Sequence, residues 1–252
     1  IGTAEAARAR PDGYTLLVGT SSTHALNPTA MDKPPYDPVK DFAPIVVLGI
    51  VPIVIAVHPS VPAKTLKELI ALVRKSPGTY AYGSSGVGSI NHLAGELLQK
   101  LTPGAVMQHV PYKGSGPSAV DLIAGQIPLL IATYSSVSSH YKAGKLRILA
   151  VFSESRMAAN PEIPTAIESG VPGMLAYTYS IICAPAGTPR PVIDTLYRAT
   201  AQVMQDKSFQ DESRALGFES VTDSNPEQAG RFIKEELARW APIIRATGAR
   251  LE

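Results

Sequence analysis

Short apolar runs alternate with amphipathic segments along the whole chain. Apolar residues recur at three- and four-residue spacing in the segments that we expect to be helical, residues 3–9, 66–75, 92–98, 119–124, 192–203, 208–216 and 226–244. Apolar runs bounded by Gly, Pro and Ser predict strands at residues 14–18, 44–57, 80–83, 106–111, 127–132, 146–152 and 176–184. Strands that alternate with helices predict an α/β architecture.

The helix expected at Leu66–Lys75 has the clearest boundaries. Thr65 is suited to cap its first turn, and Pro77 and Gly78 follow its end. The run Tyr14–Val18 is rich in apolar and β-forming residues and predicts a buried strand that ends at Gly19.

Polar turns follow several of the predicted strands. They are rich in hydroxyl groups and poor in charge, and they occupy Thr20–His24, Gly83–Ser89, Gly114–Ser118 and Thr133–Ser136. Alpha/beta sheets place their ligand-binding loops at strand ends, so this repetition favours a binding cleft. The alternative is that each turn is only a solvated loop or a helix cap, which is the commoner use of Ser and Thr.

The turn Gly83–Ser89 leads into a predicted helix and is typical of an anion-binding loop. Its glycines allow backbone N–H groups to converge on a ligand oxygen at a helix N-terminus. The run lacks the Lys-Ser or Lys-Thr ending of a nucleotide-binding loop. Val87 stands where a hydrolase nucleophile turn needs its second glycine. A carboxylate is therefore a better ligand than a nucleotide, unless the turn only reverses the chain.

Composition narrows the class of protein. Of 252 residues, 45% are hydrophobic and 17% charged, and the net charge of +2 argues against nucleic acid as the main partner. The apolar stretch Ala43–Val57 is interrupted by Pro44, Gly49 and Pro52 and is shorter than the roughly 20 residues that span a bilayer. The length suffices for one large domain or two smaller ones.

Metal and cofactor chemistry is not expected. Cys183 is the only cysteine, so no disulfide forms within the chain, and a buried structural thiol is its expected role. The histidines lack the close pairing of a zinc motif; they are His24, His58, His92, His109 and His140. His24, His92 and Lys113 stand beside polar turns and are minor candidates for contact with an anion.

Six phrases taken together resemble the substrate-binding receptors of tripartite tricarboxylate transporters, the Bug family. They are Pro11–Leu17, Asn27–Pro28, Tyr82–Gly86, His92–Glu96, Pro111–Gly114 and Ala143–Arg147. The phrases follow the family's order near its spacing, and the resemblance extends from Ile1 to the C-terminal helices.

This resemblance implies a two-lobed periplasmic binding protein of the Venus-flytrap kind, type II. Each lobe would be a mainly parallel sheet flanked by helices, with Val46–Val57 and Tyr177–Ala184 as crossing hinge strands. Residues 1–52 and 178–252 would form the first lobe, incomplete at its N-terminus, and residues 53–177 the second. A monomer is implied, exported to the periplasm by a signal peptide that this sequence does not contain. Its implied partners are a small carboxylate and the membrane subunits of the transporter.

The resemblance also bears on the ligand. The family's first ligand loop would precede Ile1, so we expect the chain without it to bind solute weakly. Ile131–Tyr134 lacks the acidic residue that many relatives carry near this point. Without a carboxylate to pair with an ammonium group, a mono- or dicarboxylate is expected rather than an amino acid.

The predicted site uses neutral donors from three of the polar turns. In the second lobe, one carboxylate would be held by backbone N–H groups and hydroxyls of Ser84, Ser85, Gly86, Gly88 and Ser89. The first lobe would contribute Thr20, Ser21, Thr23 and His24. Thr133 and Tyr134 would line the floor. No chemistry on the solute is expected, and lobe closure would strengthen each hydrogen bond by excluding water.

Two other functions remain open from the sequence. An α/β hydrolase could use Ser85 or Ser89 as nucleophile with His92 or His24 as base, although no clear acid partner is present. A ligand-sensing domain could bind the same solute and signal without transport.

Overall fold

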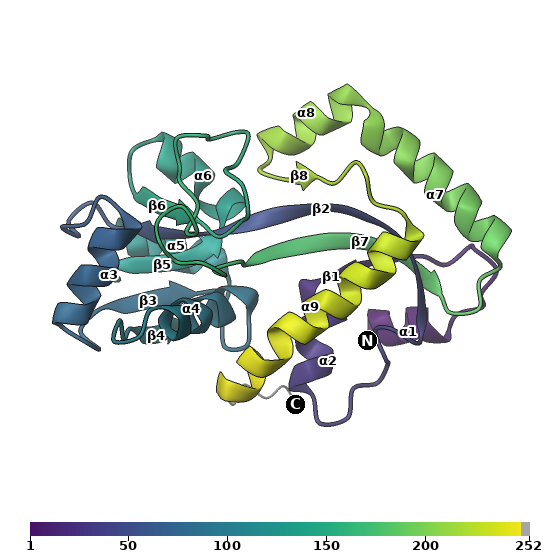
Figure 1. Cartoon of the computed structure of the whole chain (residues 1–252), viewed down its shortest axis with the longest axis horizontal. Helices are drawn as coiled ribbons and strands as arrows, with labels where there is room; N and C mark the ends of the chain where they lie inside the picture. The colour runs from purple at the N-terminus through teal and green to yellow at the C-terminus, as the bar shows by residue number, and fades with distance from the viewer. Residues whose placement is uncertain (248–252) are drawn as a thin grey trace. The chain divides into compact units, whose positions relative to one another are not determined.

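The computed structural model describes residues 1–247, which form two compact units. Unit 1 contains Ile1–Ile50 and the chain from Thr178 onward, and unit 2 is Val51–Tyr177. The chain leaves unit 1 within strand β2 (Phe42–Val57) and returns at the start of β7 (Tyr177–Pro185) (Figure 1). These points lie beside the predicted lobe boundaries, and the role of the units as receptor lobes stays a prediction.

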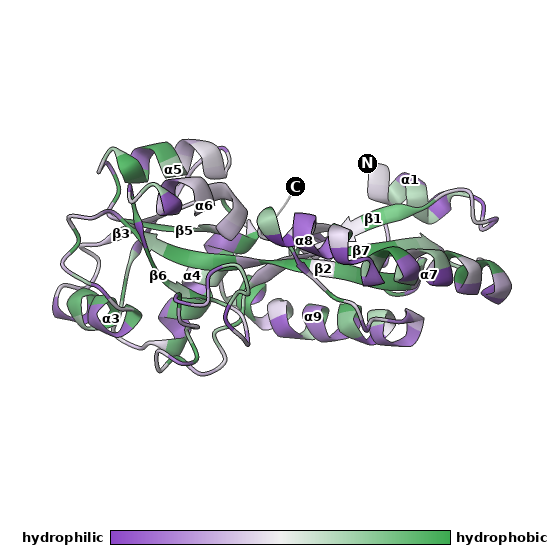
Figure 2. Ribbon diagram, turned by 90° about the horizontal axis from the view of Figure 1, so that it is seen from above, coloured by the Kyte–Doolittle hydropathy of each residue, from purple (hydrophilic) through white to green (hydrophobic). Residues whose placement is uncertain are grey.

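Unit 2 is a mixed sheet covered by helices on both faces. Its elements are α3 (Leu66–Lys75), β3 (Ala81–Ser84), α4 (Ile90–Leu101), β4 (Gln108–Pro111), α5 (Ser115–Ile123), β5 (Leu129–Thr133), α6 (Tyr134–Lys142) and β6 (Arg147–Val151). Strand β3 pairs in parallel with both β4 and β5, whereas β2 runs antiparallel to β5 and β6. Figure 2 shows α5 and α6 on one side of these strands and α3 and α4 on the other.

Unit 1 combines antiparallel strand pairs with helices. Its elements are α1 (Gly2–Arg8), β1 (Leu17–Thr20), the π-helix η1 (Ser22–Leu26), α2 (Asn27–Ala30), α7 (Arg190–Gln205), α8 (Lys207–Ala215), β8 (Glu219–Ser220) and α9 (Pro226–Thr247). Strand β1 is antiparallel to β7, and β8 is antiparallel to β2. Helix α9 packs on η1 and α2. The α/β class is confirmed, but the expected mainly parallel sheet applies only to β5, β3 and β4.

Helix α3 shows how the sequence sets an element. The Thr65 hydroxyl accepts a hydrogen bond from the Glu68 N–H at 3.1 Å, and the helix begins at Leu66 and ends at Lys75 as predicted. Glu68 lies in its first turn and Arg74 and Lys75 in its last, which suits the helix dipole.

The core of unit 2 explains the long apolar run in β2. Residues 53–57 are fully buried because both faces of the sheet are covered. On one face, Val54 and Ala56 pack with Leu130 of β5, Leu122 of α5 and Val137 of α6. A strand buried on both faces loses the polar alternation of a half-exposed strand.

Strand β1 differs from its prediction. It comprises Leu17–Thr20 rather than Tyr14–Val18, and the Tyr14 and Val18 side chains are 94% and 60% exposed. Side chains alternate between the two faces of an extended chain, and β1 pairs with β7 at the edge of the unit 1 sheet. An apolar run cannot by itself distinguish one covered face from two.

Besides α2, two helices formed by polar sequence were not predicted. Helix α6 begins at Tyr134 inside the predicted hydroxyl turn, and only Tyr134 and Val137 of its residues are buried. The π-helix η1 likewise begins inside the turn Thr20–His24. Both segments have too few apolar positions to show helical spacing.

A glycine in α4 offers a test of this packing. A Cβ at Gly95 would lie 2.3 Å from the buried Tyr82 ring, so Gly95→Ala should lower the free energy of unfolding by about 1–3 kcal/mol. Gly230→Ala in α9 is the matched control, because its Cβ would meet only Pro44 at 3.9 Å and helix propensity favours Ala. Chemical denaturation measures both, and a Gly95→Ala protein as stable as the wild type would refute the packing argument.

Candidate functional site

Three helix N-termini lie at one edge of the unit 2 sheet. Strands β5, β3 and β4 are adjacent and parallel, and each is followed by a helix: α6, α4 and α5 respectively. The unpaired N–H groups of a helix's first turn favour negative charge. This edge brings together the predicted turns Gly83–Ser89, Gly114–Ser118 and Thr133–Ser136.

The turn before α4 is held by its own polar groups. The Ser84 hydroxyl accepts from the Gly86 N–H at 3.1 Å and lies 2.6 Å from His109 Nε2. The Ser89 hydroxyl caps α4 by accepting from the His92 N–H at 3.3 Å and donates to the Gly86 carbonyl at 2.7 Å. Ser84 and Ser89 therefore shape the turn, as the capping interpretation of such residues predicts.

The glycine N–H groups of this turn are also engaged. Gly86 and Gly88 have positive φ angles of 134° and 74°, which explains glycine at both positions. The Gly88 N–H donates to His92 Nδ1 at 3.1 Å. Because Nδ1 accepts, the proton of the neutral ring lies on Nε2.

Two histidines stack beneath this turn. The rings of His92 and His109 are 3.9 Å apart at their centroids, with an interplanar angle of 17°. Burial lowers the pKa of both; the neighbouring His92 lowers the pKa of His109 further, to about 4, while Glu96 acts in the opposite direction on His92. Both rings are therefore neutral near pH 7, and the turn is held without a buried cation.

Ser85 differs from its neighbours because its hydroxyl faces the next turn. It lies 3.0 Å from Nδ2 of Asn91, and the same Nδ2 lies 3.5 Å from the Ser115 hydroxyl at the start of α5. The Gly114 N–H donates to the Ser85 carbonyl at 3.2 Å. The turns before α4 and α5 are thus joined. Neither Asn91 nor Ser115 was predicted, since a lone amide or hydroxyl in a helix's first turn has no distinctive pattern.

The third turn contributes less than predicted. Tyr134 is only 2% exposed, and its hydroxyl bonds to Asn160 Oδ1, so the Tyr134 side chain belongs to the core. Thr133 stays partly exposed at the end of β5, and its hydroxyl donates to that of Ser136 at 3.2 Å.

In unit 1, the predicted residues hold η1 against the sheet. The Thr23 hydroxyl accepts from the Thr20 N–H at 2.8 Å and lies 3.0 Å from His24 Nδ1. The buried Ser21 hydroxyl lies 3.0 Å from that of Thr178 in β7. Thr20 and Thr23 keep partial exposure.

The His24 ring is fully buried. It packs on Phe42 with centroids 5.1 Å apart, and its Nε2 lies 3.7 Å from the Cys183 sulfur. Burial lowers the pKa of His24 to about 4 and raises that of Cys183 to about 12. A Cβ at Gly19 would lie 2.4 Å from this ring, so glycine makes room for it. These contacts give His24 a packing role.

The hydrolase alternative requires the hydroxyl of Ser85 or Ser89 to bond to a histidine ring, and neither hydroxyl does so among the described residues. The hydroxyl partners of Ser85 and Ser89 are the Asn91 amide and backbone groups of the α4 turn. The side-chain pair present is Ser84 with His109, and Ser84 is fully buried.

Residues 1–247 contain neither a metal-binding cluster nor a membrane-spanning helix. Within this range no group of three or more His, Cys, Asp or Glu side chains could hold a metal ion. No helix in the same range is long and apolar enough to cross a bilayer.

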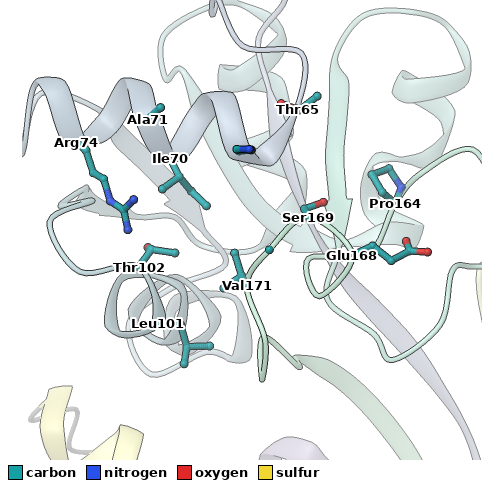
Figure 3. A pocket seen from close by; sticks show the side chains of 12 residues that line it. Thr65, Ile70, Ala71, Arg74, Leu101, Thr102, Pro164, Glu168, Ser169 and Val171 are labelled. Atoms are coloured by element: carbon teal, nitrogen blue, oxygen red, sulfur yellow. The ribbon is translucent and has the colours of Figure 1, made fainter.

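A cavity of about 660 Å³ lies elsewhere in unit 2, between α3, the C-terminal end of α4 and residues 164–171 (Figure 3). Two of its charged groups have partners: Arg74 Nε donates to the Pro103 carbonyl at 3.1 Å, and Glu168 pairs with Arg156. Leu101 and Thr102 line it, whereas the polar turns lie at the other end of α4. We therefore place the candidate site at the turns.

Comparison with known proteins identifies the family. Residues 1–249 match the model of the tripartite tricarboxylate transporter family receptor. The chain belongs to this family. Protein BugT of Bordetella pertussis is 37% identical over 253 residues, which cover 100% of this chain and 77% of BugT.

Solved structures of relatives have the same fold. Periplasmic binding protein BugD matches with a TM-score of 0.80 and 31% identity, covering 100% of this chain and 84% of BugD. R. palustris Rpa4515 with adipate matches with a TM-score of 0.83 and 33% identity over 98% of this chain and 82% of that one. MatC from Rhodopseudomonas palustris with bound malate matches with a TM-score of 0.78 and 27% identity, covering 96% of this chain and 82% of MatC. The family fold, that of a periplasmic binding protein, is thereby confirmed.

The lowered histidine pKa values predict a pH dependence of folding. A histidine pKa lowered from 6.5 to about 4 means that the folded state binds fewer protons than the unfolded state between these values. The free energy of unfolding should therefore fall as the pH falls from 6.5 towards 4. His109→Gln should reduce this slope, measured by denaturation at pH 7, 6, 5 and 4.5.

His140→Gln on α6 is the control, because His140 is outside the stacked pair. It should leave the slope unchanged. An identical slope in wild type and His109→Gln would show that His109 is not held neutral by the fold.

Proposed function

We propose that this protein is a periplasmic solute receptor that binds a small carboxylate and delivers it to the membrane subunits of a tripartite tricarboxylate transporter. The observation that carries the proposal is the convergence of the α4 and α5 N-termini, with the Ser85 and Ser115 hydroxyls, at one sheet edge. Relatives with adipate and malate support the ligand class. No reaction on the solute is proposed.

The unit 2 site would use a subset of the predicted residues. Ser85 and the first-turn N–H groups of α4 and α5 would donate to one carboxylate, with Thr133 beside them. Ser84, Ser89, Gly86 and Gly88 would shape the turn. Thr20, Ser21 and Thr23 stay the predicted contribution of the first lobe, and His24 would support their turn.

Neutral donors suit this ligand on electrostatic grounds. A buried cation would have no paired charge whenever the site is empty, which is strongly unfavourable. Backbone dipoles and hydroxyls have a smaller desolvation penalty. Lys113 is exposed and adjoins the α5 turn, so it can attract anions without being buried.

Ser85→Ala tests the carboxylate site. Because a hydrogen bond to a charged group contributes about 1.5–3 kcal/mol, the variant should bind adipate or malate at least about 10-fold more weakly. Titration calorimetry of the full-length protein measures the affinity. Ser139→Ala is the control, since Ser139 is exposed near the C-terminal end of α6, away from the turns. Equal affinities for wild type and Ser85→Ala would contradict the site, and hydrolysis of carboxylic esters by the protein would favour the enzyme alternative.

Delivery is tested in cells. Deleting the gene should abolish uptake of the acid that the purified protein binds, and wild-type protein should restore it better than Ser85→Ala. Unchanged uptake with an altered transcriptional response to the acid would favour the sensing alternative.

A further inference from the structure

Asn91 connects the two turns of the candidate site. It is the second residue of α4 and is 2% exposed, whereas Ser85 and Ser115 in front of it are partly exposed. Its Nδ2 lies 3.0 Å from the Ser85 hydroxyl and 3.5 Å from the Ser115 hydroxyl. One buried amide group therefore contacts one hydroxyl in the turn before α4 and one at the start of α5.

The chemistry of the amide nitrogen determines what these hydroxyls can do. Nδ2 can only donate. Each serine oxygen therefore accepts a hydrogen bond through one of its lone pairs, and its own O–H group remains available as a donor. Within residues 1–247, the hydroxyls of Ser85 and Ser115 have no other hydrogen-bond partner. Both protons are thus free to be donated outward to a ligand.

The other end of the Asn91 amide is a second, independent observation. Its Oδ1 is buried and has no hydrogen-bond partner among the described residues. An unpartnered buried acceptor lowers the stability of the fold, and packing alone does not require one here. Such costs gather at functional sites, where the polar group serves the ligand rather than the fold.

We propose that Asn91 is the positioning residue that sets the ligand preference of this site. By donating to Ser85 and Ser115, Asn91 presents both hydroxyls as donors and selects an ionised carboxylate over the corresponding amide. This inference rests on the proposed function. A carboxylate offers two acceptor oxygens to the two hydroxyls, whereas a carboxamide offers one oxygen and one N–H₂ group that can only donate.

Asn91→Asp is the sharpest test because it changes a donor into an acceptor at constant shape. The serine hydroxyls would then donate to the introduced carboxylate and turn their lone pairs towards the ligand, and the new charge would repel an anion. The probe is whichever of adipate and malate binds the wild type more tightly, together with its monoamide. We expect the variant to bind the diacid at least about 100-fold more weakly and to lose the wild type's preference for diacid over monoamide.

Asn225→Asp is the matched control. Asn225 Oδ1 accepts from the Gln228 N–H at the start of α9 in unit 1, and Asp serves equally well at such a position. This variant adds the same charge, so it should keep both the affinity and the preference for diacid. Denaturation of each variant confirms that it is folded.

Ser115→Ala keeps the test decisive if Asn91→Asp does not fold. Among the described residues, Asn91 is the only hydrogen-bond partner of the Ser115 hydroxyl. Removing this hydroxyl should therefore leave the fold intact and weaken diacid binding about 10-fold.

If the wild type binds neither acid, the proposed function and this inference both fail. If the wild type binds and Asn91→Asp keeps its preference, or Ser115→Ala keeps its affinity, the inference alone is overturned.

Discussion

The parallel pairing of β3 with β4 and β5 is the constraint on which the site depends. Parallel neighbours require a crossover connection, so the chain must leave each strand at the same edge before returning through a helix. The turns that precede α4, α5 and α6 consequently meet at that edge. Asn91 and Ser115 are 24 positions apart in the sequence, and the meeting of their turns at this edge allows them to come within hydrogen-bond distance.

Some polar groups at this edge form hydrogen bonds within the turn, and others remain available to bond to a ligand. Three groups have partners within the turn or beneath it: the hydroxyls of Ser84 and Ser89, and the Gly88 N–H. Among the described residues, the side-chain hydroxyls of Ser85 and Ser115 bond only to the Asn91 amide that lies between them. Similar residue types therefore have different roles, and the backbone path decides which hydroxyl has which role.

This division also explains how far the sequence could predict the molecule. Helix α3 was predicted to the residue because a cap, an apolar stripe and a Pro-Gly stop all agree. The strand-end turns were predicted from composition, but their side-chain partners depend on register and helix packing. His109 reaches Ser84 from another strand, and Asn91 reaches Ser115 from another helix. Neither pairing leaves a trace in local spacing.

The stacked histidines place a limit on how the turn can work. His92 Nδ1 can accept from the Gly88 N–H only while it is unprotonated, and His109 lies against the same ring. Two charged rings at 3.9 Å would repel each other, and burial already opposes charging either one. The structure therefore keeps positive charge out of the turn and leaves recognition to dipoles and hydroxyl protons. In such a site the direction of each O–H bond decides the ligand, which is why a single buried amide can control it.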